Sequence, residues 1–117
     1  MGTLFYGAGR LAITFDDRVL AHLQLAVSTK LRRQETFMLN WRDNESVGDG
    51  RSAVWIGPQT DLHFKYSGSR LPEINPEWVS ALVVSASTPL GLQLLDEGSL
   101  DVPPSTRNGS RRTGSAR

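Results

Sequence analysis

The chain has 117 residues and a mass of 12.9 kDa, with 38% hydrophobic residues, 21% charged residues and no cysteine. This length is enough for one compact domain with a single hydrophobic core and too short for two. The lack of cysteine excludes disulfides and thiolate metal sites, and no apolar run approaches the roughly 20 residues of a membrane span. Because the N-terminus also lacks the features of a signal peptide, we expect a cytoplasmic domain without membrane association.

Charge divides the chain into two regions. Residues 1–97 contain nine Lys and Arg against eleven Asp and Glu, a net charge of −2, whereas residues 98–117 contain four Arg against one Asp, a net charge of +3. The second region has no aromatic residue and too little apolar surface to offset the entropy of ordering. We therefore predict a folded domain at 1–97 and a disordered basic tail at 98–117. The tail is interpreted either as a solvated segment or as an electrostatic arm for phosphates or an acidic partner.

The N-terminal part predicts a hairpin and a helix. Apolar runs at 3–6 and 11–15 flank Gly7-Ala8-Gly9-Arg10, which is typical of a β-hairpin. A helix is expected over 17–33, because apolar residues recur there at spacings of three and four. Its acidic start and basic end complement the helix dipole. The apolar positions are Val19, Leu20, Leu23, Ala26, Val27 and Leu31.

The remaining part predicts three strands, a second helix and a last short strand. Alternation of apolar and polar residues indicates strands at 37–41, 52–56 and 62–66. Asn75-Pro76-Glu77 is typical of a helix start, and Pro89 marks its end. A short strand is expected at 92–94. This order predicts an α+β fold, an antiparallel sheet with two helices packed on one face.

Two glycine-rich segments, 7–12 and 48–53, fit the pattern G-x-G-x-x-A. A dinucleotide-binding loop needs a helix directly after the glycines, so that helical N–H groups meet the pyrophosphate. Strand-like sequence follows in both cases. We therefore interpret both segments as turns.

No metal site is predicted. Asp43, Glu45 and an aspartate at 49 share one loop, but Val54 stands where a calcium loop needs a bidentate Glu, so a solvated acidic loop is favoured. His22 and His63 have no second histidine at metal-ligand spacing, and His22 is expected to be structural. The carboxylates at 16 and 17 admit an acid–base interpretation, but adjacent acidic residues at a helix start are typical of caps.

Basic residues supply the candidate nucleic-acid contacts. Lys30, Arg32 and Arg33 form the densest basic cluster of the folded part. Together with Arg42, Arg51 and Arg70 they are candidates for one phosphate-contacting face, with Trp41 and Trp55 as platforms for stacking single-stranded bases. The alternative is a basic helix end that complements the dipole and two tryptophans in the core, and the strand positions of both tryptophans favour the core.

One hexapeptide, Lys65-Tyr66-Ser67-Gly68-Ser69-Arg70, resembles K-Y-D-G-x-R, the adenylation motif of ATP-dependent DNA ligases. The resemblance implies that Lys65 attacks the α-phosphate of ATP and that Arg70 helps to hold the nucleotide, with Mg²⁺ present. The chain departs from the motif at Ser67, where ligases have Asp, and at His63, where they have an acidic residue. The alternative interpretation is a strand followed by a glycine turn.

Residues 1–97 as a whole resemble a family of small proteins from high-GC Gram-positive bacteria, whose members are often named ATP-dependent DNA ligase. The resemblance implies no catalytic residue and does not extend to the tail. The segments that carry it are Met1 to Gly7, Asp16 to Gln24, Lys30 to Arg33, Phe37 to Trp41, Gly50 to Ser52 with Trp55, Gly68 to Arg70, and Asn75 with Trp78.

Three functions follow as hypotheses. The first is a non-catalytic module without a cofactor, which binds nucleic acid (DNA) or a protein partner. The alternative is a ligase-like nucleotidyl protein, or its remnant, which would need ATP and Mg²⁺ and would use Lys65 and Arg70. The third is a structural or regulatory protein that pairs with itself through an edge strand. The sequence leaves the oligomeric state open.

Overall fold

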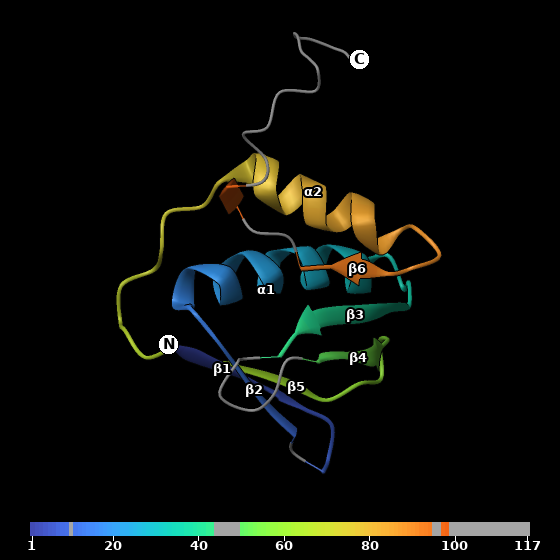
Figure 1. Cartoon of the computed structure of the whole chain (residues 1–117), viewed down its shortest axis with the longest axis horizontal. Helices are drawn as coiled ribbons and strands as arrows, with labels where there is room; N and C mark the ends of the chain where they lie inside the picture. The colour runs from blue at the N-terminus through green and yellow to red at the C-terminus, as the bar shows by residue number, and fades with distance from the viewer. Residues whose placement is uncertain (10, 44–49, 95–96, 99–117) are drawn as a thin grey trace, which may run out of the picture.

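The computed structural model describes residues 1–9, 11–43, 50–94 and 97–98. The predicted tail therefore lies, apart from Gly98, outside the described residues, as do positions 45 and 49 of the acidic loop. Figure 1 shows the two helices together at one end of the molecule and the β1–β2 hairpin at the other. The elements are β1 (Gly2–Tyr6), β2 (Leu11–Phe15), α1 (Asp17–Arg32), β3 (Phe37–Arg42), β4 (Arg51–Ile56), β5 (Leu62–Lys65), α2 (Pro76–Ala86) and β6 (Leu92–Gln93).

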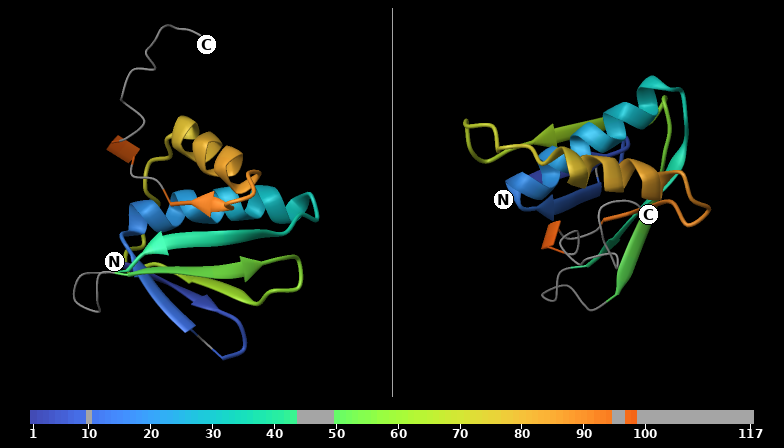
Figure 2. Two further views of the ribbon diagram at one scale, coloured as in Figure 1. Left: turned by 45° about the vertical axis from the view of Figure 1, so that its right-hand side comes forward. Right: turned by 90° about the horizontal axis from the view of Figure 1, so that it is seen from above.

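The predicted α+β class and the element order are confirmed, but the strands form two small sheets. Sheet A has the order β2-β1-β5 and is antiparallel throughout. Sheet B has the order β4-β3-β6, in which β4 is antiparallel and β6 parallel to β3. The single antiparallel sheet of the sequence interpretation is thus corrected. Figure 2 shows the strands of the two sheets running at an angle to each other, linked by the short connection from β4 to β5.

Strand β6 runs parallel to β3 because the chain reaches it through α2, which supplies a crossover connection. Gly91 permits the segment before β6 to lie close to the backbone of β3. Its φ is +87°, and a Cβ built there would lie 2.6 Å from the Met38 carbonyl oxygen. The Asn40 side-chain amide donates to the carbonyl oxygens of Leu90 and Leu92 at 2.9 and 3.2 Å, which fixes the segment against β3.

The first helix buries one face, and two nested backbone hydrogen bonds close its C-terminus. The Gln34 N–H donates to the Leu31 carbonyl at 3.0 Å and the Glu35 N–H to the Lys30 carbonyl at 3.2 Å. Gln34 has a φ of +62°, so a left-handed residue closes the helix as in a Schellman motif. The chain thereby reverses toward β3.

The second helix begins as predicted. The Asn75 side chain accepts a hydrogen bond of 3.0 Å from the Glu77 N–H, and Pro76 is the first helical residue. Such a cap stabilises a helix by about 1 kcal/mol. The helix ends at Ala86, three residues before Pro89.

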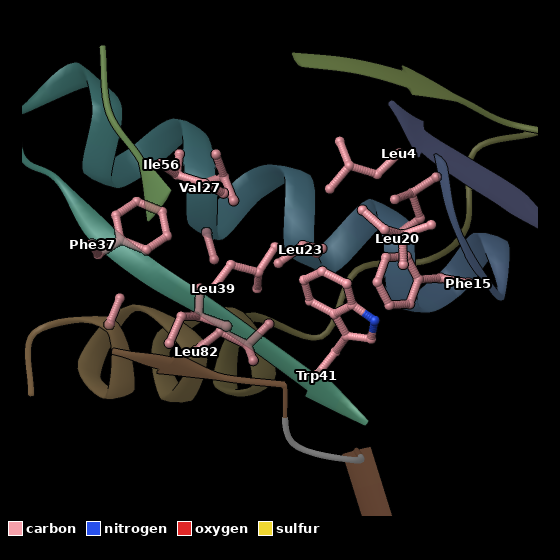
Figure 3. Close-up of a cluster of buried hydrophobic side chains, with 14 of the residues drawn as sticks. Leu4, Phe15, Leu20, Leu23, Val27, Phe37, Leu39, Trp41, Ile56 and Leu82 are labelled. Atoms are coloured by element: carbon pink, nitrogen blue, oxygen red, sulfur yellow. The ribbon is translucent and has the colours of Figure 1, made fainter. Parts of the chain in front are cut away.

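One hydrophobic core lies between the inner faces of both sheets and the helices. In the close-up of Figure 3, Leu4 of β1 and Leu39 of β3 approach the same cluster as Leu20 and Leu23 of α1. Phe15 and Trp41 meet edge to face with ring centroids 6.5 Å apart, which joins the two sheets. The inner faces of both sheets are therefore packed in the core, whereas the outer faces of the sheets point away from it.

In the part of the chain that the structure describes, no helix is long and apolar enough to cross a membrane.

Candidate nucleic-acid interface

The outer face of sheet B carries the strongest candidate site. The strands pair so that Met38 lies opposite Trp55 and Arg42 opposite Arg51. Successive residues of a strand point to opposite faces, so Arg51 and Trp55 share the face that Arg42 and Met38 occupy on β3. We call the three residues Arg42, Arg51 and Trp55 the arginine–tryptophan face.

Trp55 is 54% exposed, whereas Trp41 is 8% exposed. The prediction that both tryptophans belong to the core is therefore correct for Trp41 and wrong for Trp55. The reason is the alternation of inward and outward residues along β4. On β4 the inner positions are Val54 and Ile56, and Trp55 falls between them on the solvent side. The stacking platform proposed at this residue is thus accessible, and the one proposed at Trp41 is not.

The two arginines lie directly opposite each other on β3 and β4. The Asp43 N–H donates to the Gly50 carbonyl at 2.9 Å, which sets the alternation of the ladder and makes Arg42 and Arg51 a non-hydrogen-bonded pair. Side chains in such pairs are closest, with Cα atoms about 4.5 Å apart. Like charges on directly opposed residues tend to destabilise a sheet. The pair concentrates positive charge at one end of β4, about 13 Å along the strand from Trp55.

Acidic residues are absent from the strands. Eleven Asp and Glu occur in residues 1–97, yet none of the six described strands contains one. The ionisable side chains of the strands, apart from Tyr6, are Arg42, Arg51, His63 and Lys65. The negative net charge of the domain is therefore carried by helices and connections, and both outer sheet faces are neutral or basic.

Tyr6 links the two sheets beside Trp55. Its hydroxyl donates to the Trp55 carbonyl, and this carbonyl points away from β3 because Trp55 belongs to a non-hydrogen-bonded pair. The Gly7 N–H donates to the Asp61 carbonyl at 2.8 Å. These contacts hold the end of β4 against the junction of β1 and β5.

Lys30, which the sequence offered as a phosphate contact, is buried at the end of α1. Its side chain is buried, with 4% of the residue exposed, and its Nζ lies 2.7 Å from Glu35 Oε1 and donates to Ser87 Oγ at 2.9 Å. The hydrogen bond from Lys30 holds the pKa of Glu35 below its ordinary value, against the smaller opposing effect of burial. Lys30 thus ties the end of α1 to the end of α2, and this buried pairing argues against the predicted nucleic-acid contact at Lys30.

The other predicted basic contacts do not form one face. Arg32 and Arg33 are exposed at the end of α1, from which the chain enters β3 at Phe37. Arg51 lies at the opposite end of the β3–β4 pair, about 17 Å away along the strands. Arg70 follows β5, near the start of α1, and α1 is about 24 Å long. The structure brings together only Arg42 and Arg51 of the set.

The ligase-like hexapeptide begins on an edge strand and continues into a turn. Lys65 is exposed at the end of β5 and pairs with Thr3 of β1. The N–H groups of Ser67 and Gly68 donate to the carboxylate of Asp17, at 3.4 and 3.2 Å. These hydrogen bonds lower the pKa of Asp17, although burial acts in the opposite sense and is the largest single influence. The carboxylate of Asp17 thus occupies two backbone donors of the turn after the lysine, those of Ser67 and Gly68.

His22 has a structural role. It is fully buried, its Nδ1 lies 2.7 Å from the Arg18 carbonyl, and its Nε2 accepts a hydrogen bond of 2.8 Å from the Asn75 N–H. Its ring lies against Trp78, with centroids 4.3 Å apart. Among the described residues, no group of three His, Asp or Glu is placed to hold a metal ion.

The carboxylate pair at the helix start is not a joint cap, because Asp16 makes no side-chain cap and Asp17 binds the turn at 67–68.

A family model for a domain of unknown function, DUF7882, matches residues 1–97. The chain belongs to this family. No curated protein and no solved structure matches the chain. The family domain therefore covers the two helices and six strands of the described residues, together with the arginine–tryptophan face.

The DUF7882 domain ends at Glu97, which anchors a polar network that the sequence did not reveal. The Arg18 guanidinium donates to both Glu97 carboxylate oxygens, at 2.9 and 2.7 Å, and the Asn75 amide donates to one of them at 2.9 Å. Arg18 also donates to the Glu73 carbonyl. The hydrogen bonds from Arg18 and then Asn75 lower the pKa of Glu97 to about 2. The network ties the end of the domain to the starts of both helices.

Proposed function

We propose that this protein is a non-catalytic module that binds single-stranded nucleic acid on the arginine–tryptophan face. The observation that carries the proposal is the exposed Trp55 on the same sheet face as the directly opposed Arg42 and Arg51. Proteins that bind single strands combine exposed aromatic rings, on which bases stack, with cationic side chains along the backbone. A sheet face that offers both supports this function.

The binding would be weak and sensitive to salt. Each phosphate neutralised on a single strand contributes about −0.7 to the slope of log K against log salt concentration. Two arginines therefore contribute about −1.4. The absence of carboxylates from the described strands favours an anionic ligand over a basic one.

The test uses the intrinsic fluorescence of the full chain. Trp41 and Trp78 are 8% and 2% exposed, so quenching by an oligothymidylate of about 12 nucleotides reports on Trp55. We expect saturable quenching at low salt. Replacing Arg51 with alanine should reduce the magnitude of the salt slope by about 0.7.

The matched control is Arg33→Ala, which removes the same charge from the far end of α1. It should leave the slope within error of the wild type. Absence of quenching at low salt, or equal effects of the two substitutions, would contradict the proposal. A concentration-dependent mass in light scattering, without quenching, would instead favour the self-associating protein.

A further inference from the structure

The outer face of sheet A carries a second set of aromatic and cationic side chains. Phe5 of β1 lies opposite His63 of β5, with ring centroids 5.3 Å apart and an interplanar angle of 42°. Lys65 lies two residues beyond His63, and therefore on the same face, about 7 Å along the strand. His63 and Lys65 are exposed.

We infer that this face is a second contact site for the same single strand, and that it makes binding depend on the length of the ligand. The inference rests on the proposed function. Phe5 and His63 would stack a base, and the ammonium group of Lys65 would bind a phosphate, as in other single-strand sites. The lysine singled out by its ligase-like hexapeptide thus has a role as a backbone contact.

The position of the two faces supports one continuous ligand. Both inner faces belong to the same core, so both outer faces are directed away from it. The chain passes from the end of β4 to the start of β5 through residues 57–61, so these strand ends lie close together. There the Tyr6 hydroxyl binds the Trp55 carbonyl, and Tyr6 directly follows Phe5 in β1. A strand that leaves Trp55 across this junction reaches the Phe5–His63 pair first and Lys65 next.

Charge complementarity favours a polyanion as the occupant. The residues that β1, β2 and β5 direct to this outer face are Thr3, Phe5, Ala12, Thr14, His63 and Lys65, none of which is acidic. An acidic protein segment would pair with Lys65, whereas a polynucleotide supplies phosphates for Lys65 and bases for the two aromatic surfaces, Trp55 and the Phe5–His63 pair. Base stacking uses both, because every base has a flat face.

The experiment compares oligothymidylates of about four and about 12 nucleotides on the full chain, with Lys65→Gln as the test variant and Arg32→Gln as the matched control. Both substitutions remove one exposed positive charge. We expect the longer ligand to bind more tightly to the wild type. Lys65→Gln should reduce the salt slope of the longer ligand by about 0.7 and leave the shorter ligand unchanged. Arg32→Gln should change neither.

The outcomes separate the inference from the function on which it rests. Quenching of Trp55 with no effect of Lys65→Gln on the longer ligand would overturn the second site and leave the first intact. An equal loss for both ligands would also overturn it, because Lys65 would then belong to the primary site. Absence of Trp55 quenching by either oligonucleotide would refute the proposed function itself. His63→Ala provides an independent readout, since loss of one stacked base weakens the longer ligand by about 5- to 150-fold.

Discussion

Replacement of Trp55 tests the proposed ligand binding and the folding role of this residue separately, and the exposed fraction of Trp55 sets the expected cost to folding. A tryptophan buries roughly 200 Å² when fully packed, and Trp55 is 54% exposed, so it contributes roughly half of that area. At about 25 cal/mol per Å², Trp55→Ala costs at most about 2.5 kcal/mol of folding free energy. Trp41, which is 8% exposed, contributes about twice as much, and Trp41→Ala should cost about 3–5 kcal/mol.

Trp55→Leu is the sharper variant, because leucine retains apolar contact with Met38 on the neighbouring strand and removes the aromatic ring. We expect a stability loss below the alanine figure, measured by urea unfolding, and a 5- to 150-fold weaker affinity for labelled oligothymidylate in fluorescence anisotropy. A folded Trp55→Leu protein with wild-type affinity would refute the stacking argument. If Trp41→Ala cost no more stability than Trp55→Ala, the division of sheet B into an inner and an outer face would be wrong.

Two further predictions concern Glu97 and Lys65. The pKa of Glu97 is lowered to about 2 in the fold, against an ordinary value near 4.5, so its stabilising effect is complete above about pH 4.5 and is lost as the pH falls toward 2. Glu97→Gln should therefore lower the Tm near pH 7 and flatten the acid side of the Tm profile, and an unchanged acid slope would show that the Arg18 pair is not maintained in solution. For Lys65, we expect no AMP-sized mass gain in intact-mass spectrometry after incubation with Mg²⁺ and ATP, because the amides of the following turn bind Asp17. A gain in the wild type that is absent from Lys65→Ala would establish a nucleotidyltransferase.

Local sequence patterns were sufficient to predict the helices and strands of this fold. The spacing of apolar residues predicted α1 to within one residue of its end at Arg32, and Asn75-Pro76 predicted the start of α2. These signals are local because helix periodicity and capping depend on neighbours within one turn. The partition of the strands into two sheets depends instead on which strands meet after the chain has reversed. No local pattern contains that information.

Two residues were misplaced although their positions carried a signal. Lys30 follows Ala26 by four residues and Val27 by three, which puts it on the buried face of α1, and only its charge suggested a surface position. The fold accommodates the ammonium group with Glu35 and Ser87. Trp55 shares its strand parity with Arg51, whereas Val54 and Ile56 occupy the inner positions. Parity within β4 therefore outweighs the general tendency of tryptophan to be buried.

The separation of charge explains how a domain with a net charge of −2 can present a site for an anion. Net charge governs the long-range approach of a charged ligand, and the net charge of −2 slightly disfavours the approach of a nucleic acid. At contact distance the field is set by the nearest side chains, since charges beyond about 8–10 Å are largely screened at physiological salt. On the outer face of sheet B the charged side chains provided by the strands are those of Arg42 and Arg51. Under the proposed function, a phosphate that binds beside Arg42 and Arg51 would reduce the repulsion between these two directly opposed cations.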